Sequence, residues 1–173
     1  MTAAPRIYVA SLSDYNAGRL HGTWIDANQD TDDIKDAISA MLKDSKEPVA
    51  EEYAIHDYEN FGPIKLREHE SIDDVARIAA AIDEHGEAFK LAYANFSDLD
   101  AALEAVTEHY QGSFRSLEDW AEQFLSDTGA FQGVSDTLQM YFDYDRYARD
   151  AELGGDIWSD TDSEGNVHVF WNR

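Results

Sequence analysis

The stretch SLEDWAEQFLSDTG at residues 116–129 decides how the second half of this chain folds. Ser116 is a favourable helix N-cap, and Asp119 stands three residues later, where the carboxylate of a capping box belongs. Gly129 can take the left-handed conformation that ends a helix. The apolar residues recur at helical spacing and predict one buried face: Leu117, Trp120, Ala121, Phe124 and Leu125. We therefore expect an amphipathic helix.

The charge of this predicted helix is entirely negative. Its acids, Glu118, Asp119, Glu122 and Asp127, lie off the apolar face, and no Lys or Arg falls inside the stretch. A surface helix usually mixes signs, because each Glu–Lys pair at i, i+4 stabilises it by about 0.2–0.5 kcal/mol. The helix lacks that stabilisation, and other predicted helices of the chain also have acids without Lys or Arg to pair with them.

Composition predicts a folded, strongly acidic protein. The 173 residues hold 36 acids against 13 bases, so the formal net charge is −23, yet 43% of residues are hydrophobic and 12% aromatic. Self-repulsion on this scale destabilises a compact state. It disfavours direct binding of nucleic acid or of an anionic membrane, and it favours a basic partner. The absence of cysteine excludes disulfides, thiolate nucleophiles and cysteine-based metal sites.

The sequence predicts neither a signal peptide nor a membrane-spanning segment. The N-terminal MTAAPRIYVASL lacks the apolar run of a signal peptide, and no 18-residue apolar stretch occurs. We expect a soluble cytoplasmic protein.

The first 61 residues alternate between strand and helix patterns. Strands are expected at 6–12, 22–26 and 51–57, with turn chemistry at 14–18. A helix should be capped by Asp30 or Thr31, and its apolar positions recur at helical spacing: Ile34, Ala37, Ile38, Met41 and Leu42.

From Phe61-Gly62-Pro63 onward the pattern becomes helical. Ser71 and Asp74 form another predicted capping box, and His85-Gly86 should break the helix. Ser97 is the expected cap of the next helix, whose acids at i, i+4 and i+8 form a predicted ridge without an intervening base: Asp100, Glu104 and Glu108.

The remaining residues predict a helix over about 136–151 and a terminal hairpin. That helix carries Leu138, Tyr141, Phe142 and Tyr144. Segments 156–159 and 167–171 flank a turn at Glu164-Gly165-Asn166. The predicted fold class is α+β, built as three small domains: a sheet with a helix at 1–61, a central helical domain at 62–97 and an acidic α+β domain at 98–173.

Sequence motifs argue against an enzyme or a metal protein. No two of the six histidines stand at i, i+3 or i, i+4, and no P-loop, GxGxxG or GxSxG occurs. Residues 160–165, DTDSEG, resemble half of a calcium loop, but the twelfth position holds Trp171 instead of Glu, so a hairpin turn is favoured over calcium binding. Asp143 and Asp145 form a DxD whose side chains diverge on a helix. We expect no catalytic residue, metal or cofactor.

The negative charge admits three interpretations: mimicry of DNA, halophilic adaptation, or an acidic surface for some other basic partner. B-form DNA carries about one charge per 1.7 Å of axis, so 23 excess charges correspond to about 12 base pairs, or about 40 Å of duplex. Carboxylates on a folded scaffold could therefore occupy a groove lined with Lys and Arg. Charge alone leaves the three interpretations open.

Several long stretches resemble one family. PRIYVASLSDYNAGRLHGTWID at 5–26 is similar to the start of the ArdA antirestriction proteins of conjugative plasmids and transposons. EEYAIHDYENFGPIKL at 51–66 continues the likeness, 116–129 resembles the family's acidic antirestriction motif, and YFDYDRYARDAEL at 141–153 resembles the helix after it. The likeness covers nearly the whole chain.

This resemblance implies an elongated, dimeric mimic of bent B-form DNA that inhibits type I restriction–modification enzymes, without enzymatic activity or cofactor. The alternative is an acidic binding or chaperone module for another basic DNA-binding protein. Trp120, Phe124 and Leu125 are then expected at the dimer contact or in the core. The expected DNA-mimicking surface comprises Asp98, Asp100, Glu104, Glu108, Glu118, Asp119, Glu122, Asp127, Asp136, Asp143, Asp145 and Asp150.

Overall fold

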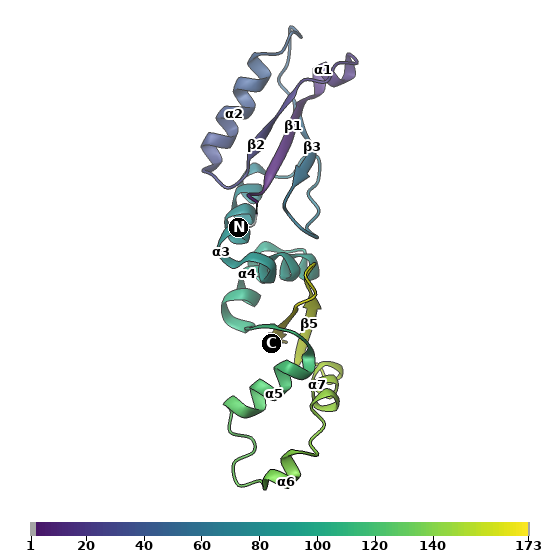
Figure 1. Cartoon of the computed structure of the whole chain (residues 1–173). Coiled ribbons are helices and arrows are strands. Elements are labelled where there is room, and N and C mark those ends of the chain that lie inside the picture. Colours follow the sequence, from purple (N-terminus) through teal and green to yellow (C-terminus); the bar gives the residue numbers. More distant parts are fainter. Residues whose placement is uncertain (1–2, 173) are drawn as a thin grey trace. The chain divides into compact units, whose positions relative to one another are not determined.

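The computed structural model describes residues 3–172 and divides the chain into two compact units, Met1–Ala102 and Leu103–Arg173. Helices and two small antiparallel sheets build these units (Figure 1), so the predicted α+β class is confirmed. The first unit contains both the predicted N-terminal domain and the predicted central domain. The division into three domains stays a prediction.

The first unit is built on a three-stranded antiparallel sheet in the order β2-β1-β3. The expected strands are confirmed to within two residues at each end. Alternate residues of the sheet, including Ile7, Val9 and Ile25, are buried. Of the five predicted apolar positions of the following helix, Ile34, Ile38 and Met41 are buried, and the other two are half-buried. The elements are β1 (Arg6–Ser11), β2 (Gly22–Asp26), α2 (Thr31–Lys43) and β3 (Tyr53–Glu59).

The segment expected as a turn at 14–18 begins instead as a short helix, α1 (Leu12–Asn16). Its Asp14 is 2% exposed and accepts a hydrogen bond from the hydroxyl of Ser45. This bond, with help from Ser11, lowers the pKa of Asp14 although burial opposes the shift. Arg19 also lies 3.6 Å from the Asp14 carboxylate. Ser45 lies 31 residues away in the sequence, so the local turn pattern did not reveal this contact.

The central helix α3 (Ile72–Phe96) follows, and Gly86 interrupts it as predicted, with φ 60° and ψ −137°. The expected capping box at its start is wrong. Ser71 occupies the N-cap but its side chain makes no capping hydrogen bond, and the carboxylate of Asp74 lies 3.9 Å from Arg77. The Asp74 carboxylate, which a capping box would need, lies near Arg77 instead.

The next helix begins one residue later than predicted. Ser97 is the left-handed C-cap of α3, with φ 54°, so it cannot cap the following helix. Asp98 caps α4 (Leu99–Glu104) instead, because its carboxylate accepts from the backbone N–H of Ala101 at 2.8 Å. The helix then widens into a π-turn, η1 (Ala105–His109).

The second unit packs helices on a sheet of order β4-β6-β5. The predicted terminal hairpin is confirmed, with Ile157 opposite Trp171 and Thr161 opposite Val167. The prediction of a single helix over 136–151 is wrong, because this segment forms two short helices separated by Met140–Asp143. The elements are β4 (Tyr110–Phe114), α5 (Leu117–Asp127), α6 (Asp136–Gln139), α7 (Tyr144–Leu153), β5 (Ile157–Thr161) and β6 (Val167–Trp171).

Candidate functional site

Trp120 fixes the orientation of α5 and therefore of its acids. Its side chain is 1% exposed, stacks on Phe124 with ring centroids 5.4 Å apart, and lies 6.3 Å from the ring of Tyr147 on α7. Its Nε1–H donates to Oε1 of Gln111 on β4 at 3.1 Å. The buried cluster also contains Ala121, Ala148, Ile157 and Val169. With this face turned inward, the acidic face of α5 is turned to solvent.

Half of the predicted capping box forms at the start of α5. The Ser116 hydroxyl accepts from the N–H of Asp119 at 3.1 Å, as expected. The Asp119 carboxylate instead accepts from the backbone and guanidinium of Arg115, at 3.3 and 2.7 Å. These bonds lower the pKa of Asp119. One of the helix's acids is therefore neutralised by a base just outside the motif.

Each arginine that the structure describes in the second unit forms an ion pair with a nearby aspartate. Arg149 lies 2.7 Å from Asp145, and Arg146 lies 3.8 Å from Asp150, both on α7 at i, i+4 spacing. Arg115 pairs with Asp119 at the same spacing. No further Lys or Arg occurs between residues 103 and 172. Each described arginine of the second unit is thus paired with an aspartate on the same or the adjoining helical turn, and the remaining acids of this unit are in excess.

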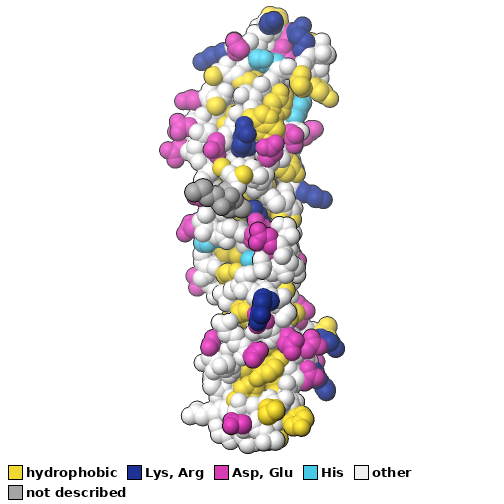
Figure 2. Space-filling model, viewed as in Figure 1, with side chains coloured by type: hydrophobic (Ala, Val, Ile, Leu, Met, Phe, Trp, Pro, Cys, Tyr) yellow, Lys and Arg dark blue, Asp and Glu magenta, His cyan; other side chains and the backbone are white. Residues whose placement is uncertain are grey.

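The predicted acidic surface is solvent-facing. All twelve residues are exposed except Asp119, which is half-buried. Figure 2 shows acidic side chains spread over the viewed face of both units and not gathered in one cleft. Two of the twelve act as helix caps, Asp98 for α4 and Asp143 for α7. Among residues 3–172, no ion pair involves Glu108, Glu118, Glu122, Asp127 or Asp136.

The predicted ridge of three acids is corrected in two ways. Arg77 donates to Asp100 at 2.9 Å, so the ridge has a cation that sequence spacing did not reveal. The α-helical repeat ends at Glu104, because the π-turn begins at Ala105 and changes the spacing to Glu108. His109 Nε2 lies 3.6 Å from Glu104 and forms an ion pair with it only when protonated.

Three apolar side chains in and just after α6 are exposed, which the sequence pattern did not predict; we call Leu138, Met140 and Tyr141 the α6 patch. Leu138 is 65% exposed, and Met140 and Tyr141 are each 83% exposed. Leu138 and Tyr141 were expected within one helix over about 136–151. The break at Met140–Asp143 leaves them on the surface of the second unit, beside the smaller apolar surfaces of Val134 and Phe142.

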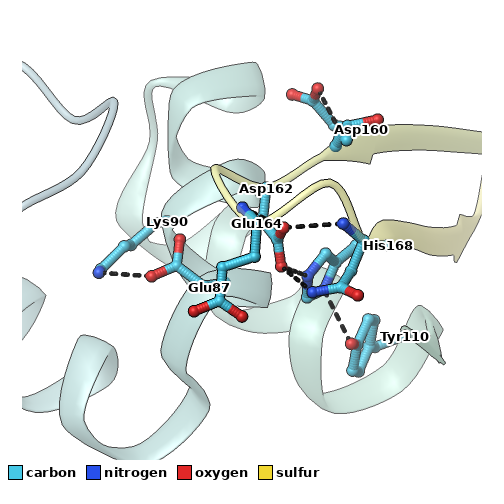
Figure 3. A network of polar contacts seen from close by, with 9 residues as sticks. Glu87, Lys90, Tyr110, Asp160, Asp162, Glu164 and His168 are labelled. Carbon is cyan, nitrogen blue, oxygen red and sulfur yellow. Dashed lines mark hydrogen bonds and ion pairs between the residues drawn. The ribbon is translucent and has the colours of Figure 1, made fainter. Parts of the chain in front are cut away.

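A buried polar chain holds the terminal hairpin to β4 (Figure 3). Oδ2 of Asp162 accepts from His168 Nε2 at 3.1 Å, and His168 Nδ1 lies 2.9 Å from the Tyr110 hydroxyl. Asp162 also accepts from the side chain and N–H of Asn166. Burial alone would raise the pKa of Asp162, but these hydrogen bonds outweigh it and lower the pKa well below 3.8. The loop that resembles a calcium site is thus a hairpin turn whose carboxylate is fully used.

We expect the Asp162→Asn substitution to destabilise the second unit by about 1.5–3 kcal/mol at pH 7, the range for hydrogen bonds to a charged group. Since the folded-state pKa lies below the unfolded one, this stabilisation is complete above pH ~4 and declines as the pH falls further. The difference between wild type and variant in urea unfolding should therefore shrink from pH 5 to pH 2.5. A constant difference would contradict an ionised Asp162.

Metal binding and membrane insertion find no support in residues 3–172. No group of three or more His, Asp or Glu side chains in this range could hold a metal ion. The DxD residues are engaged separately, Asp143 as the cap of α7 and Asp145 with Arg149. No helix in the same range is both long enough and apolar enough to cross a membrane.

Comparison with protein families gives a match over most of the chain. The model of a family described as antirestriction protein (ArdA) matches residues 7–163, which include both sheets apart from the last strand and all the helices described above. No curated protein matches the chain.

Proposed function

Because this chain belongs to the ArdA family of antirestriction proteins, we propose that it inhibits a type I restriction–modification enzyme by occupying the groove in which that enzyme binds DNA. The inhibitor would act stoichiometrically, through a surface of fixed carboxylates, and without catalysis or a cofactor. Since restriction enzymes of this type act on DNA inside the cell, the cytoplasm is the proposed place of action.

The observation that carries this proposal is the pairing of arginines in the second unit. Arg115, Arg146 and Arg149 are each held by an aspartate one turn away, so none is available to weaken the field of the unpaired acids. Along α5, the step from Glu118 to Glu122 spans about 6 Å at 1.5 Å rise per residue. A DNA duplex carries one charge per about 1.7 Å of axis, so the charges on one helix are more widely spaced than those of DNA. The mimicry therefore needs the acids of several helices together.

We further propose that the chain acts as a homodimer and that the α6 patch is its contact surface. The patch lies in the second unit, which also carries the α5 acids, so pairing two copies there would extend the acidic surface. Replacing Leu138 and Tyr141 together by glutamate should convert the dimer to a monomer without loss of helix content. Sedimentation velocity checks this expectation, and an unchanged sedimentation coefficient would refute this contact.

The proposed inhibition should depend steeply on salt. Titrating the protein into a type I enzyme cleaving unmodified DNA should give complete inhibition at a fixed ratio of one or two chains per enzyme. Raising NaCl from 50 to 200 mM should lower the apparent affinity by at least about tenfold, as for DNA itself. Inhibition at far substoichiometric amounts would show turnover. Binding to the enzyme without an effect on cleavage would favour the alternative of a general acidic chaperone.

A further inference from the structure

Strand β2 has a free edge whose backbone groups can be assigned. Ser11 N–H donates to the His21 carbonyl and Ala27 N–H donates to the Pro5 carbonyl, at 2.9 Å each. Those pairs fix the alternation of the antiparallel ladder, so Thr23 and Ile25 point their backbone groups toward β1. The N–H and C=O groups of the intervening residues, Gly22 and Trp24, therefore point away from the sheet.

Those outward groups have no partner within the described residues. β2 pairs only with β1 in the sheet, and no hydrogen bond to the backbone of Gly22 or Trp24 from another element is present in residues 3–172. The opposite edge differs, since the N–H of Ile55 on β3 donates to the Glu68 carbonyl at 2.8 Å. Native edge strands are usually blunted by Lys, Pro or a covering segment, and β2 contains neither Lys nor Pro.

A groove is lined by residues of β2 and of α2. Its volume is about 770 Å³, and side chains of α2 form its far wall, among them Ala37, Ala40 and Met41. At one end His21 Nε2 bonds the Met41 carbonyl at 2.7 Å, and at the other Gln29 donates to the Asp26 carbonyl at 2.8 Å. The groove thus has a mixed lining, with two small apolar side chains, Ala37 and Ala40, on the side of α2.

The charge of the groove selects its occupant. Asp26 and Asp44 line it, and no Lys or Arg does. A second copy of this chain docking through the same groove would bring Asp26 and Asp44 of both copies together. A basic segment meets complementary charge instead.

We propose that β2 accepts an extended, basic peptide segment of a partner protein as a fourth strand of this sheet. The peptide backbone pairs with the outward groups of Gly22 and Trp24, and alternate side chains enter the groove against Ala37 and Ala40. This contact lies in the first unit and is independent of the acidic surface of α5.

The test uses the full chain and the peptide acetyl-KVKVKV-amide as probe. Titration followed by ¹H–¹⁵N spectra should shift the amide signals of Gly22, Trp24 and Asp26. The same peptide with all backbone amides N-methylated keeps its charge but cannot donate hydrogen bonds, and we expect it to bind at least about tenfold more weakly. Equal binding of both peptides, or shifts confined to the acidic helices of the second unit, would overturn the proposal in favour of plain charge attraction.

Variants separate the backbone contact from side-chain effects. Trp24→Pro removes an outward N–H and leaves the ladder to β1 intact, so it should abolish binding, whereas the matched Trp24→Ala should retain it. Asp44→Lys should weaken binding several-fold whether or not the proline variant folds. Binding that withstands Asp44→Lys, or concentration-dependent self-association through β2, would contradict a basic occupant.

Discussion

Replacing Trp120 by alanine is expected to lower the free energy of unfolding of the second unit by about 3–5 kcal/mol, the cost of truncating a fully buried tryptophan. Its indole is 1% exposed and lies between Phe124 and Tyr147, so truncation leaves a cavity that α5 and α7 both line. Urea unfolding followed by circular dichroism measures the loss. For a unit of this size the change is a large share of its total stability.

The control is Trp120→Phe, which keeps most of the packing but loses the hydrogen bond to Gln111. Since Nε2 of Gln111 already lacks a partner among the described residues, this variant leaves the whole amide unsatisfied. We expect it to cost about 1–3 kcal/mol, less than alanine. Folded Trp120→Ala protein should still inhibit restriction. A stable variant that no longer dimerises would instead place Trp120 at the subunit contact.

Local periodicity predicted most of the fold. The three strands of the first sheet, the helix after Thr31 and the terminal hairpin all have spacing that only one structure satisfies. The helix at Leu117–Asp127 combines an N-cap, one apolar face and a terminal glycine, and these signals agree. Where helix or strand propensity, capping residues and hydrophobic period all predict the same element, the structure contains that element.

Two errors show what a local pattern leaves out. Asp14 is held by Ser45, 31 residues away, and a turn becomes a helix. Helical spacing also places Leu138 and Tyr141 on one side of a helix, but the helix ends at Gln139. Local spacing shows neither a partner distant in sequence nor the end of this helix.

The candidate site shows the same division. The identity and exposure of its acids could be predicted, because charged side chains off an apolar face must meet water. Their pairing could not. Arg115 lies just outside the acidic motif and neutralises Asp119, and Arg77 reaches Asp100 from 23 residues away. The unpaired acids are therefore fewer than the sequence indicates.

Neutralising the five unpaired acids together should weaken inhibition strongly. The variant carries Gln or Asn at Glu108, Glu118, Glu122, Asp127 and Asp136, and each exposed charge contact contributes about 0.2–1 kcal/mol. The sum, about 1–5 kcal/mol, corresponds to a loss of affinity from about fivefold to about four-thousandfold. Inhibition titrations of a type I enzyme measure it, and the dependence on salt should become shallower because fewer charges take part.

Two controls decide whether charge itself is responsible. Exchanging Glu for Asp and Asp for Glu at the same five positions keeps every charge while altering each side chain, and this variant should inhibit like the wild type. Glu104→Ala alone should be nearly silent, because it removes one charge from a collective field. If a single substitution abolished inhibition, or if the charge-preserving exchange were as damaging as neutralisation, the partner would be recognising individual side chains at a discrete site, and the acidic surface would not be standing in for a phosphate backbone.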